Sequence, residues 1–99
     1  MTRKTDTQTG TQTGTERDAR TRRARPRIVV LYNDDVHAFE EVVLQVQKAT
    51  GKALPEAVRI TLVAHTRGKS VAFSGTLAEC QRVAAVLRGI RLQVEVDEA

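Results

Sequence analysis

The chain has 99 residues, of which 28% are charged, and a formal net charge of +4 at pH 7; this length allows one small domain. The positive charge is concentrated in the first 27 residues, which hold eight Thr and eight Arg or Lys against three acidic residues. Residues 28–99 carry eight basic and nine acidic residues. The folded part therefore lacks the excess of positive charge expected of a nucleic-acid-binding face.

We expect residues 1–26 to form a disordered N-terminal extension and residues 27–99 to form the folded domain. The extension has almost no apolar side chains, so it cannot bury enough surface to offset the entropy of ordering it. It contains no apolar run typical of a secretory signal, and its acidic residues argue against a transit peptide. No segment has the roughly 20 apolar residues of a membrane span. A single cysteine, Cys80, excludes an internal disulfide, and together these features favour a cytoplasmic protein.

The first predicted strand is the β-branched run at 28–32, which ends at the turn-forming cluster Asn33-Asp34-Asp35. A helix is predicted from Phe39, because apolar residues recur there at i, i+3, i+4 and i+7. Gly51 suits the end of this helix. The apolar stripe consists of Phe39, Val42, Val43 and Val46.

A second helix is predicted to begin at Pro55, whose fixed φ suits the first helical position, and to end before Gly68. Its inward-facing side chains are expected to be those of Val58, Thr61 and Leu62. A short strand is predicted at 70–73.

Thr76 and Glu79 have the spacing of a capping box and predict the start of a third helix. This helix should bury Cys80, Val83, Ala84 and Leu87 and end at Gly89. Leu92, Val94 and Val96 then alternate with polar residues, as in a half-buried strand. The predicted class is α+β: a compact β-α-α-β-α-β domain with a small three-stranded antiparallel sheet and three helices packed on one face.

Nothing in the sequence predicts an enzyme, a metal site or a cofactor site. Cys80 has no adjacent base that would activate a thiolate and is expected to pack in the core. The potential ligands show no recognised metal-binding spacing; they are His37, His65, Asp34, Asp35 and Cys80. Gly68-Lys69 lacks the preceding glycine loop of a phosphate-binding motif.

Asn33, Asp35 and His65 are the candidate binding residues. Their plain interpretation is structural, with Asn33 and Asp35 forming a turn and His65 providing a favourable charge at a helix C-terminus. If the three converge, they supply an amide oxygen, a carboxylate and a neutral imidazole nitrogen. These acceptors match the three N–H donors of a peptide α-ammonium group.

Two motifs resemble those of the ClpS family. The segment 29–35, Val-Val-Leu-Tyr-Asn-Asp-Asp, followed by a helix, is similar to the opening of that family. The segment 63–69, Val-Ala-His-Thr-Arg-Gly-Lys, resembles its second signature, His-x-x-Gly-Lys after an apolar helix. The order of elements also matches, and the resemblance covers residues 27–96.

The resemblance implies a non-catalytic, monomeric adaptor without a cofactor. ClpS proteins bind N-degrons, substrates that begin with Leu, Phe, Tyr or Trp, and deliver them to a ClpA or ClpC unfoldase for degradation by ClpP. By this resemblance, Asn33, Asp35 and His65 hold the substrate's α-amino group. The walls of the pocket for the first side chain would be Phe39, Val42, Thr61, Leu62, Ala64 and Leu92. The N-terminal extension would engage the unfoldase.

The chain departs from the family pattern at several positions near the expected pocket, among them Ala64, where Val is typical. His37 stands where the family often has Thr, Phe39 where Met is common, and Thr61 where a larger apolar residue is common. One alternative is therefore a ClpS-like regulator of the unfoldase with altered or lost degron binding, its pocket filled by Phe39. A more distant alternative is a basic tail that binds nucleic acid, but a Thr-rich tail without aromatic residues offers no stacking platform.

Overall fold

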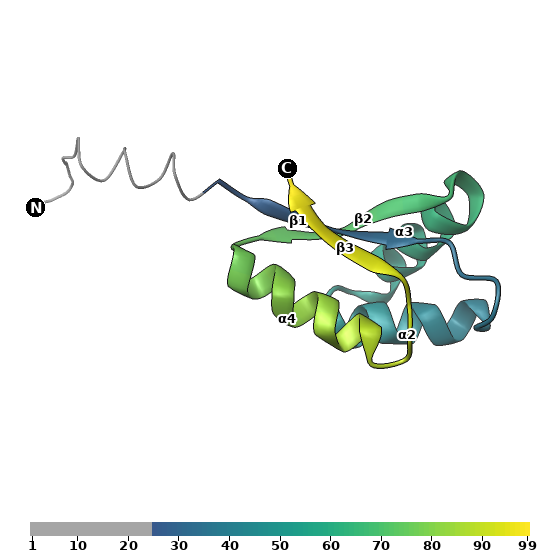
Figure 1. Cartoon of the computed structure of the whole chain (residues 1–99). Coiled ribbons are helices and arrows are strands. Elements are labelled where there is room, and N and C mark those ends of the chain that lie inside the picture. Colours follow the sequence, from purple (N-terminus) through teal and green to yellow (C-terminus); the bar gives the residue numbers. More distant parts are fainter. Residues whose placement is uncertain (1–24) are drawn as a thin grey trace, which may run out of the picture.

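The computed structural model describes residues 25–99, so nearly all of the predicted extension at 1–26 lies outside the described residues. The described chain forms a three-stranded antiparallel sheet with three helices on one face (Figure 1). The elements are β1 (Arg27–Tyr32), α2 (Phe39–Thr50), α3 (Leu54–Arg67), β2 (Lys69–Gly75), α4 (Leu77–Arg88) and β3 (Val94–Glu98). The predicted α+β class and the order β-α-α-β-α-β are confirmed.

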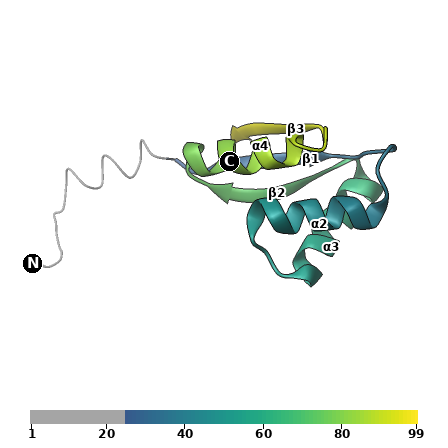
Figure 2. The same ribbon diagram turned by 90° about the horizontal axis from the view of Figure 1, so that it is seen from below.

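β1 is the central strand and pairs antiparallel with β2 on one side and β3 on the other. Successive side chains of a strand point to opposite faces. Val29 and Leu31 project towards the helices and belong to the core, whereas Val30 lies on the other face. Figure 2 shows α2 and α3 side by side, with α4 running along β1 and β3. One face of the sheet is thus covered by helices.

α2 begins and ends where the sequence predicts. Val42, Val43 and Val46 are buried, as expected from their spacing. Gly51 takes φ 73 and donates its backbone N–H to the carbonyl of Gln47. A residue without Cβ adopts this positive φ at low cost. Phe39 differs from the rest of the predicted stripe, because at the first turn its side chain remains 37% exposed.

The buried face of α3 differs from the prediction. Leu62 is 48% exposed and points outward, so its expected inward position was wrong. The buried residues are Ala57, Ile60, Thr61 and Ala64, which share the helical spacing i, i+3, i+4 and i+7. Two of these four are alanines, and their small side chains gave a weaker apolar signal than the leucine beside them.

α4 begins at the predicted capping box. The Thr76 hydroxyl oxygen accepts from the Glu79 backbone N–H at 3.1 Å, and the Glu79 carboxylate accepts from the Thr76 backbone N–H at 2.9 Å. The predicted stripe of Cys80, Val83, Ala84 and Leu87 is fully buried. The helix ends at Gly89 with ordinary helical φ, and the residue with positive φ in the following turn is Arg91.

We expect Thr76→Ala to lower the free energy of unfolding by about 1 kcal/mol, because it removes a capping interaction of α4. Urea unfolding followed by circular dichroism measures this change. Thr66→Ala is the matched control, since the Thr66 hydroxyl bonds only to carbonyls of its own helix. Equal effects of the two substitutions would show that the capping box contributes nothing specific.

Candidate functional site

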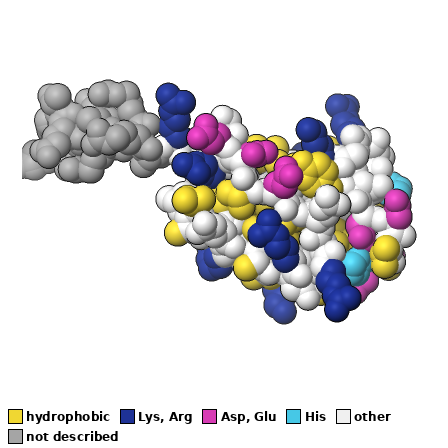
Figure 3. Space-filling view, in the orientation of Figure 1, with side chains coloured by type: hydrophobic (Ala, Val, Ile, Leu, Met, Phe, Trp, Pro, Cys, Tyr) yellow, Lys and Arg dark blue, Asp and Glu magenta, His cyan; other side chains and the backbone are white. Residues whose placement is uncertain are grey.

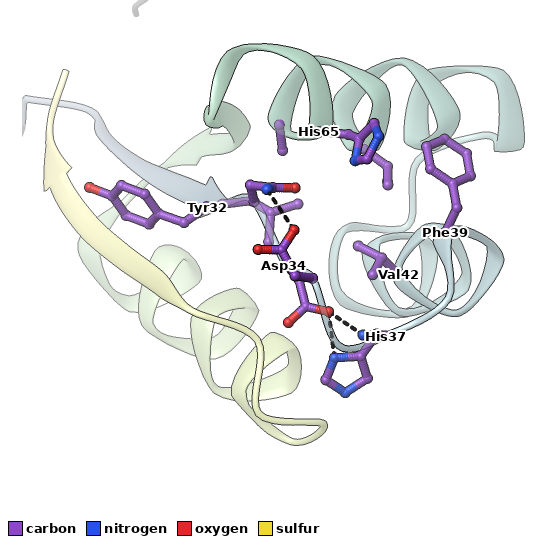
Figure 4. A pocket seen from close by; sticks show the side chains of 11 residues that line it. Tyr32, Asp34, His37, Phe39, Val42 and His65 are labelled. Atoms are coloured by element: carbon purple, nitrogen blue, oxygen red, sulfur yellow. Dashed lines mark hydrogen bonds and ion pairs between the residues drawn. The ribbon is translucent and has the colours of Figure 1, made fainter.

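A cavity of about 260 Å³ opens where the end of β1 faces α2 and α3. Its volume lies below the roughly 300–1,000 Å³ of pockets for drug-sized ligands, so it suits one large side chain. Its wall is formed by Leu31, Tyr32, Asn33, Asp34, Asp35, His37, Phe39, Val42, Thr61, Ala64 and His65. Polar residues from the loop after β1 lie on one side and mostly apolar residues from the helices on the other (Figure 4).

A backbone hydrogen bond holds the two sides together. The Asn33 N–H donates to the Gly68 carbonyl at 2.9 Å, directly after Tyr32 pairs with Lys69 in the sheet. Gly68 takes φ 95 and ends α3, so the chain passes from α3 straight into β2. His65 lies in the last turn of α3 and therefore faces the loop that carries Asn33.

Asn33, Asp35 and His65 all line this one cavity. The Asn33 side-chain amide donates to a carboxylate oxygen of Asp35 at 3.2 Å. This bond uses one N–H of the Asn33 side chain. The amide oxygen of Asn33 and the second carboxylate oxygen of Asp35 can still accept hydrogen bonds. The loop thus presents hydrogen-bond acceptors beside the imidazole of His65.

Asp34 has a different role from its neighbour Asp35. One oxygen of its carboxylate accepts from the His37 backbone N–H and also contacts the His37 ring nitrogen Nδ1 at 2.7 Å. The two side chains are only 15% and 16% exposed. Figure 4 shows this pair on the side of the loop away from His65. The Asp34 carboxylate is therefore bonded to His37 and not directed towards His65.

The Asp34–His37 pair shifts the pKa of both groups. Burial alone would raise the pKa of Asp34, but the hydrogen bonds from His37 and the charge of its ring outweigh burial and hold the pKa below the ordinary 3.8. The bond to Asp34 raises the pKa of His37 above 6.5 against the effect of desolvation, with help from the charge of Glu41 and a backbone contact at Ile90. The pair therefore favours a charged imidazole next to a charged carboxylate.

Four of the six residues expected in the wall of the side-chain pocket line the cavity: Phe39, Val42, Thr61 and Ala64. The placement of the other two is corrected. Leu62 follows Thr61 by one position, which turns its side chain about 100° around the helix and out to solvent. Leu92 is 3% exposed and belongs to the core cluster, because the chain turns inward before β3 begins.

Sequence reasoning missed Leu31, Tyr32, Asp34 and His37 as residues of the wall. A signal existed for Leu31, because alternation along β1 places it on the inner face next to the loop. Tyr32 donates its hydroxyl to a Glu95 carboxylate oxygen at 2.7 Å, and this bond raises the pKa of Tyr32. No spacing pattern indicates such a contact between strands.

Metal binding finds no support in residues 25–99, where no three His, Cys, Asp or Glu side chains form a group that could hold an ion. Cys80 is fully buried in the core. None of the described helices is long and apolar enough to cross a membrane.

Comparison with known proteins gives consistent matches. The family model described as "ATP-dependent Clp protease adaptor protein ClpS" matches residues 22–94. The ATP-dependent Clp protease adapter protein ClpS of Desulfatibacillum aliphaticivorans is 45% identical over 58 residues, which cover 59% of this chain and 56% of that protein. The chain thus aligns with little more than half the length of that relative.

The fold also matches a solved structure, that of Agrobacterium tumefaciens ClpS2 bound to L-phenylalaninamide. The TM-score is 0.72 at 17% sequence identity, and the match covers 77% of this chain and 99% of the other. At this level of identity, the similarity establishes a shared fold.

We expect His37→Asn to destabilise the protein in a pH-dependent way. A raised pKa means that the contribution of His37 is fully present below the unfolded pKa of about 6.5 and is lost as the pH rises through the folded value. The lowered pKa of Asp34 means that its contribution is lost only as the pH falls below about 3.8. The difference in free energy of unfolding between wild type and variant should therefore be larger at about pH 5.5 than at about pH 8.5.

Urea unfolding at the two pH values measures this difference. Asp34→Asn provides the control background, because without the carboxylate the effect of His37→Asn should lose its pH dependence. If His37→Asn lowers the free energy of unfolding by the same amount at both pH values when Asp34 is present, His37 and Asp34 do not form a stabilising ion pair.

Proposed function

Because the chain belongs to the ClpS family of ATP-dependent Clp protease adaptor proteins, we propose that its cavity captures proteins by their first residue. The α-ammonium group of the substrate binds between Asn33, Asp35 and His65, and the first side chain enters the cavity. One observation carries this proposal: three acceptor-bearing side chains lie at one cavity that is large enough for a single side chain.

The recognition of the amine rests on matched donors and acceptors. An α-ammonium group has three N–H donors and a positive charge. The Asn33 amide oxygen, the Asp35 carboxylate and a neutral nitrogen of His65 accept them, and the carboxylate makes one of these bonds charge-assisted. The hydrogen bond between Asn33 and Asp35 holds both side chains in place before the substrate arrives. An acetylated N-terminus has one N–H and no charge, so it should be rejected.

Recognition of the first side chain rests on burial. Phe39, Val42 and Ala64 provide apolar surface, and burying a large apolar side chain is worth about 1.5–3 kcal/mol. Leu, Phe, Tyr and Trp fit this description, whereas a charged side chain would lose its hydration without a partner. The related ClpS2 structure supports this proposal, since its ligand, L-phenylalaninamide, combines a free amine with a benzyl side chain.

Delivery is the second half of the proposed function. A Clp adaptor that holds a substrate by its first residue leaves the rest of that protein free for an AAA+ unfoldase of the ClpA or ClpC type, which feeds ClpP. Residues 1–26 would engage the unfoldase. The adaptor itself is proposed to be monomeric, cytoplasmic and non-catalytic, and it needs no cofactor.

The alternative, a regulator without degron binding, required a pocket filled by Phe39. The cavity is instead open beside Phe39, which is 37% exposed. The nucleic-acid alternative concerns the basic tail, of which residues 1–24 lie outside the described part of the chain. On the face of the domain in Figure 3, basic and acidic side chains are both spread over the surface. Substrate capture therefore remains the better proposal.

We expect Asp35→Ala to weaken binding of a peptide that begins with Leu by about 10- to 100-fold, because it removes a charge-assisted hydrogen bond to the amine. Fluorescence anisotropy with labelled peptides measures the affinity, and an acetylated Leu peptide should not bind. Asp97→Ala is the matched control, since Asp97 is an exposed acid on β3 that does not line the cavity. Absence of binding of free Leu, Phe, Tyr and Trp peptides to the folded wild-type protein would refute the proposal.

A further inference from the structure

Thr61 is the residue with a hydroxyl group on the side of the cavity wall formed by α2 and α3, beside the apolar side chains of Phe39, Val42 and Ala64. It is 4% exposed and lies on the inner face of α3, one turn before Ala64. Its hydroxyl donates to the backbone carbonyl of Ala57 at 2.8 Å. A hydroxyl has one proton to donate and two lone pairs to accept. Since the proton is already used, the Thr61 oxygen can act towards the cavity only as an acceptor.

The side chains around Thr61 leave this acceptor unsatisfied. Phe39, Val42 and Ala64 have no polar side-chain atoms. Two polar side chains of the wall are engaged within the loop after β1, Asn33 with Asp35 and His37 with Asp34. His65 lies one turn after Thr61 on α3 and, in the proposed function, binds the substrate amine. No hydrogen bond donated to the Thr61 oxygen is found within residues 25–99. The hydroxyl is satisfied as a donor, but its lone pairs can still accept, so a ligand that donates to it keeps a hydrogen bond when it is buried.

We infer that Thr61 makes the cavity favour a first residue with a hydrogen-bond donor at the tip of a large side chain, tyrosine or tryptophan, over phenylalanine or leucine. This inference rests on the proposed function and names the substrates that the same site prefers. The tyrosine O–H or the tryptophan N–H donates to the Thr61 hydroxyl oxygen as the ring is buried.

The preference follows from desolvation. When a phenol enters an entirely apolar cavity, it loses its hydrogen bond to water without replacement, so such a cavity favours phenylalanine. One acceptor in the wall reverses this order, because the phenol keeps a hydrogen bond. A wall that holds a buried hydroxyl discriminates between ligands with and without a matching polar group more strongly than a purely apolar wall does.

The rival explanation is that the Thr61 hydroxyl serves only its own helix through Ala57. In that case, replacing it would affect every peptide equally. The two explanations therefore differ in one quantity, the ratio of affinities for two peptides that are identical except for tyrosine or phenylalanine at the first position.

The test uses the full chain with a labelled Phe peptide, displaced by unlabelled Tyr and Phe peptides of otherwise identical sequence. Thr61→Val replaces the hydroxyl by a methyl group of similar size, and Thr61→Ser keeps the hydroxyl. We expect the Tyr-to-Phe affinity ratio to fall about fivefold in Thr61→Val, which corresponds to one neutral hydrogen bond, and to be retained in Thr61→Ser. Any loss of stability in a variant affects both peptides alike and cancels in the ratio.

The outcomes separate this inference from the proposed function. If both peptides bind the wild type and the ratio is unchanged in Thr61→Val, the inference is overturned and the proposed function stands. If neither peptide binds the folded wild type, the proposed function fails and the inference fails with it.

Discussion

The hydrogen bond from the Asn33 backbone N–H to the Gly68 carbonyl is the constraint on which the candidate site depends. It extends the pairing of β1 with β2 by one residue beyond Tyr32 and Lys69. Because Gly68 takes φ 95 at the end of α3, the helix ends where the strand begins, and His65 is brought to the loop after β1. Backbone pairing thereby brings together two motifs that lie about thirty residues apart in the sequence.

The two neighbouring carboxylates in the loop after β1 have different partners. Asp34 pairs with the ring of His37, and this contact raises the pKa of His37 and so favours the charged ring beside the carboxylate. Asp35 is exposed, and among residues 25–99 its carboxylate bonds to the neutral amide of Asn33. One carboxylate is therefore paired within the loop, and the other is available to a ligand. A cationic group at the cavity meets one uncompensated carboxylate, which suits an α-ammonium group of unit charge.

The sequence predicted the elements well where large apolar residues mark the buried face. The stripes of α2 and α4 and the capping box at Thr76 fall where periodicity and capping chemistry place them. The prediction was wrong for the inward position of Leu62, and it placed Leu92 in a wall that Leu92 does not line. The Asp34–His37 pair and the cavity carry no periodic signal, because both depend on how a loop and two helices pack.

The weak signal on α3 and the cavity have a common physical origin. A helix that turns Thr61 and Ala64 towards its neighbours has little side-chain volume to fill the space beside Phe39 and Val42. Interiors are normally close-packed, so small residues at this position leave room that a substrate side chain can occupy. Larger residues at these two positions would have marked the buried face of α3 more plainly and left less room in the cavity. The helix whose buried face was hardest to predict from the sequence is therefore the one that leaves room for the proposed substrate side chain, as expected where function competes with simple packing.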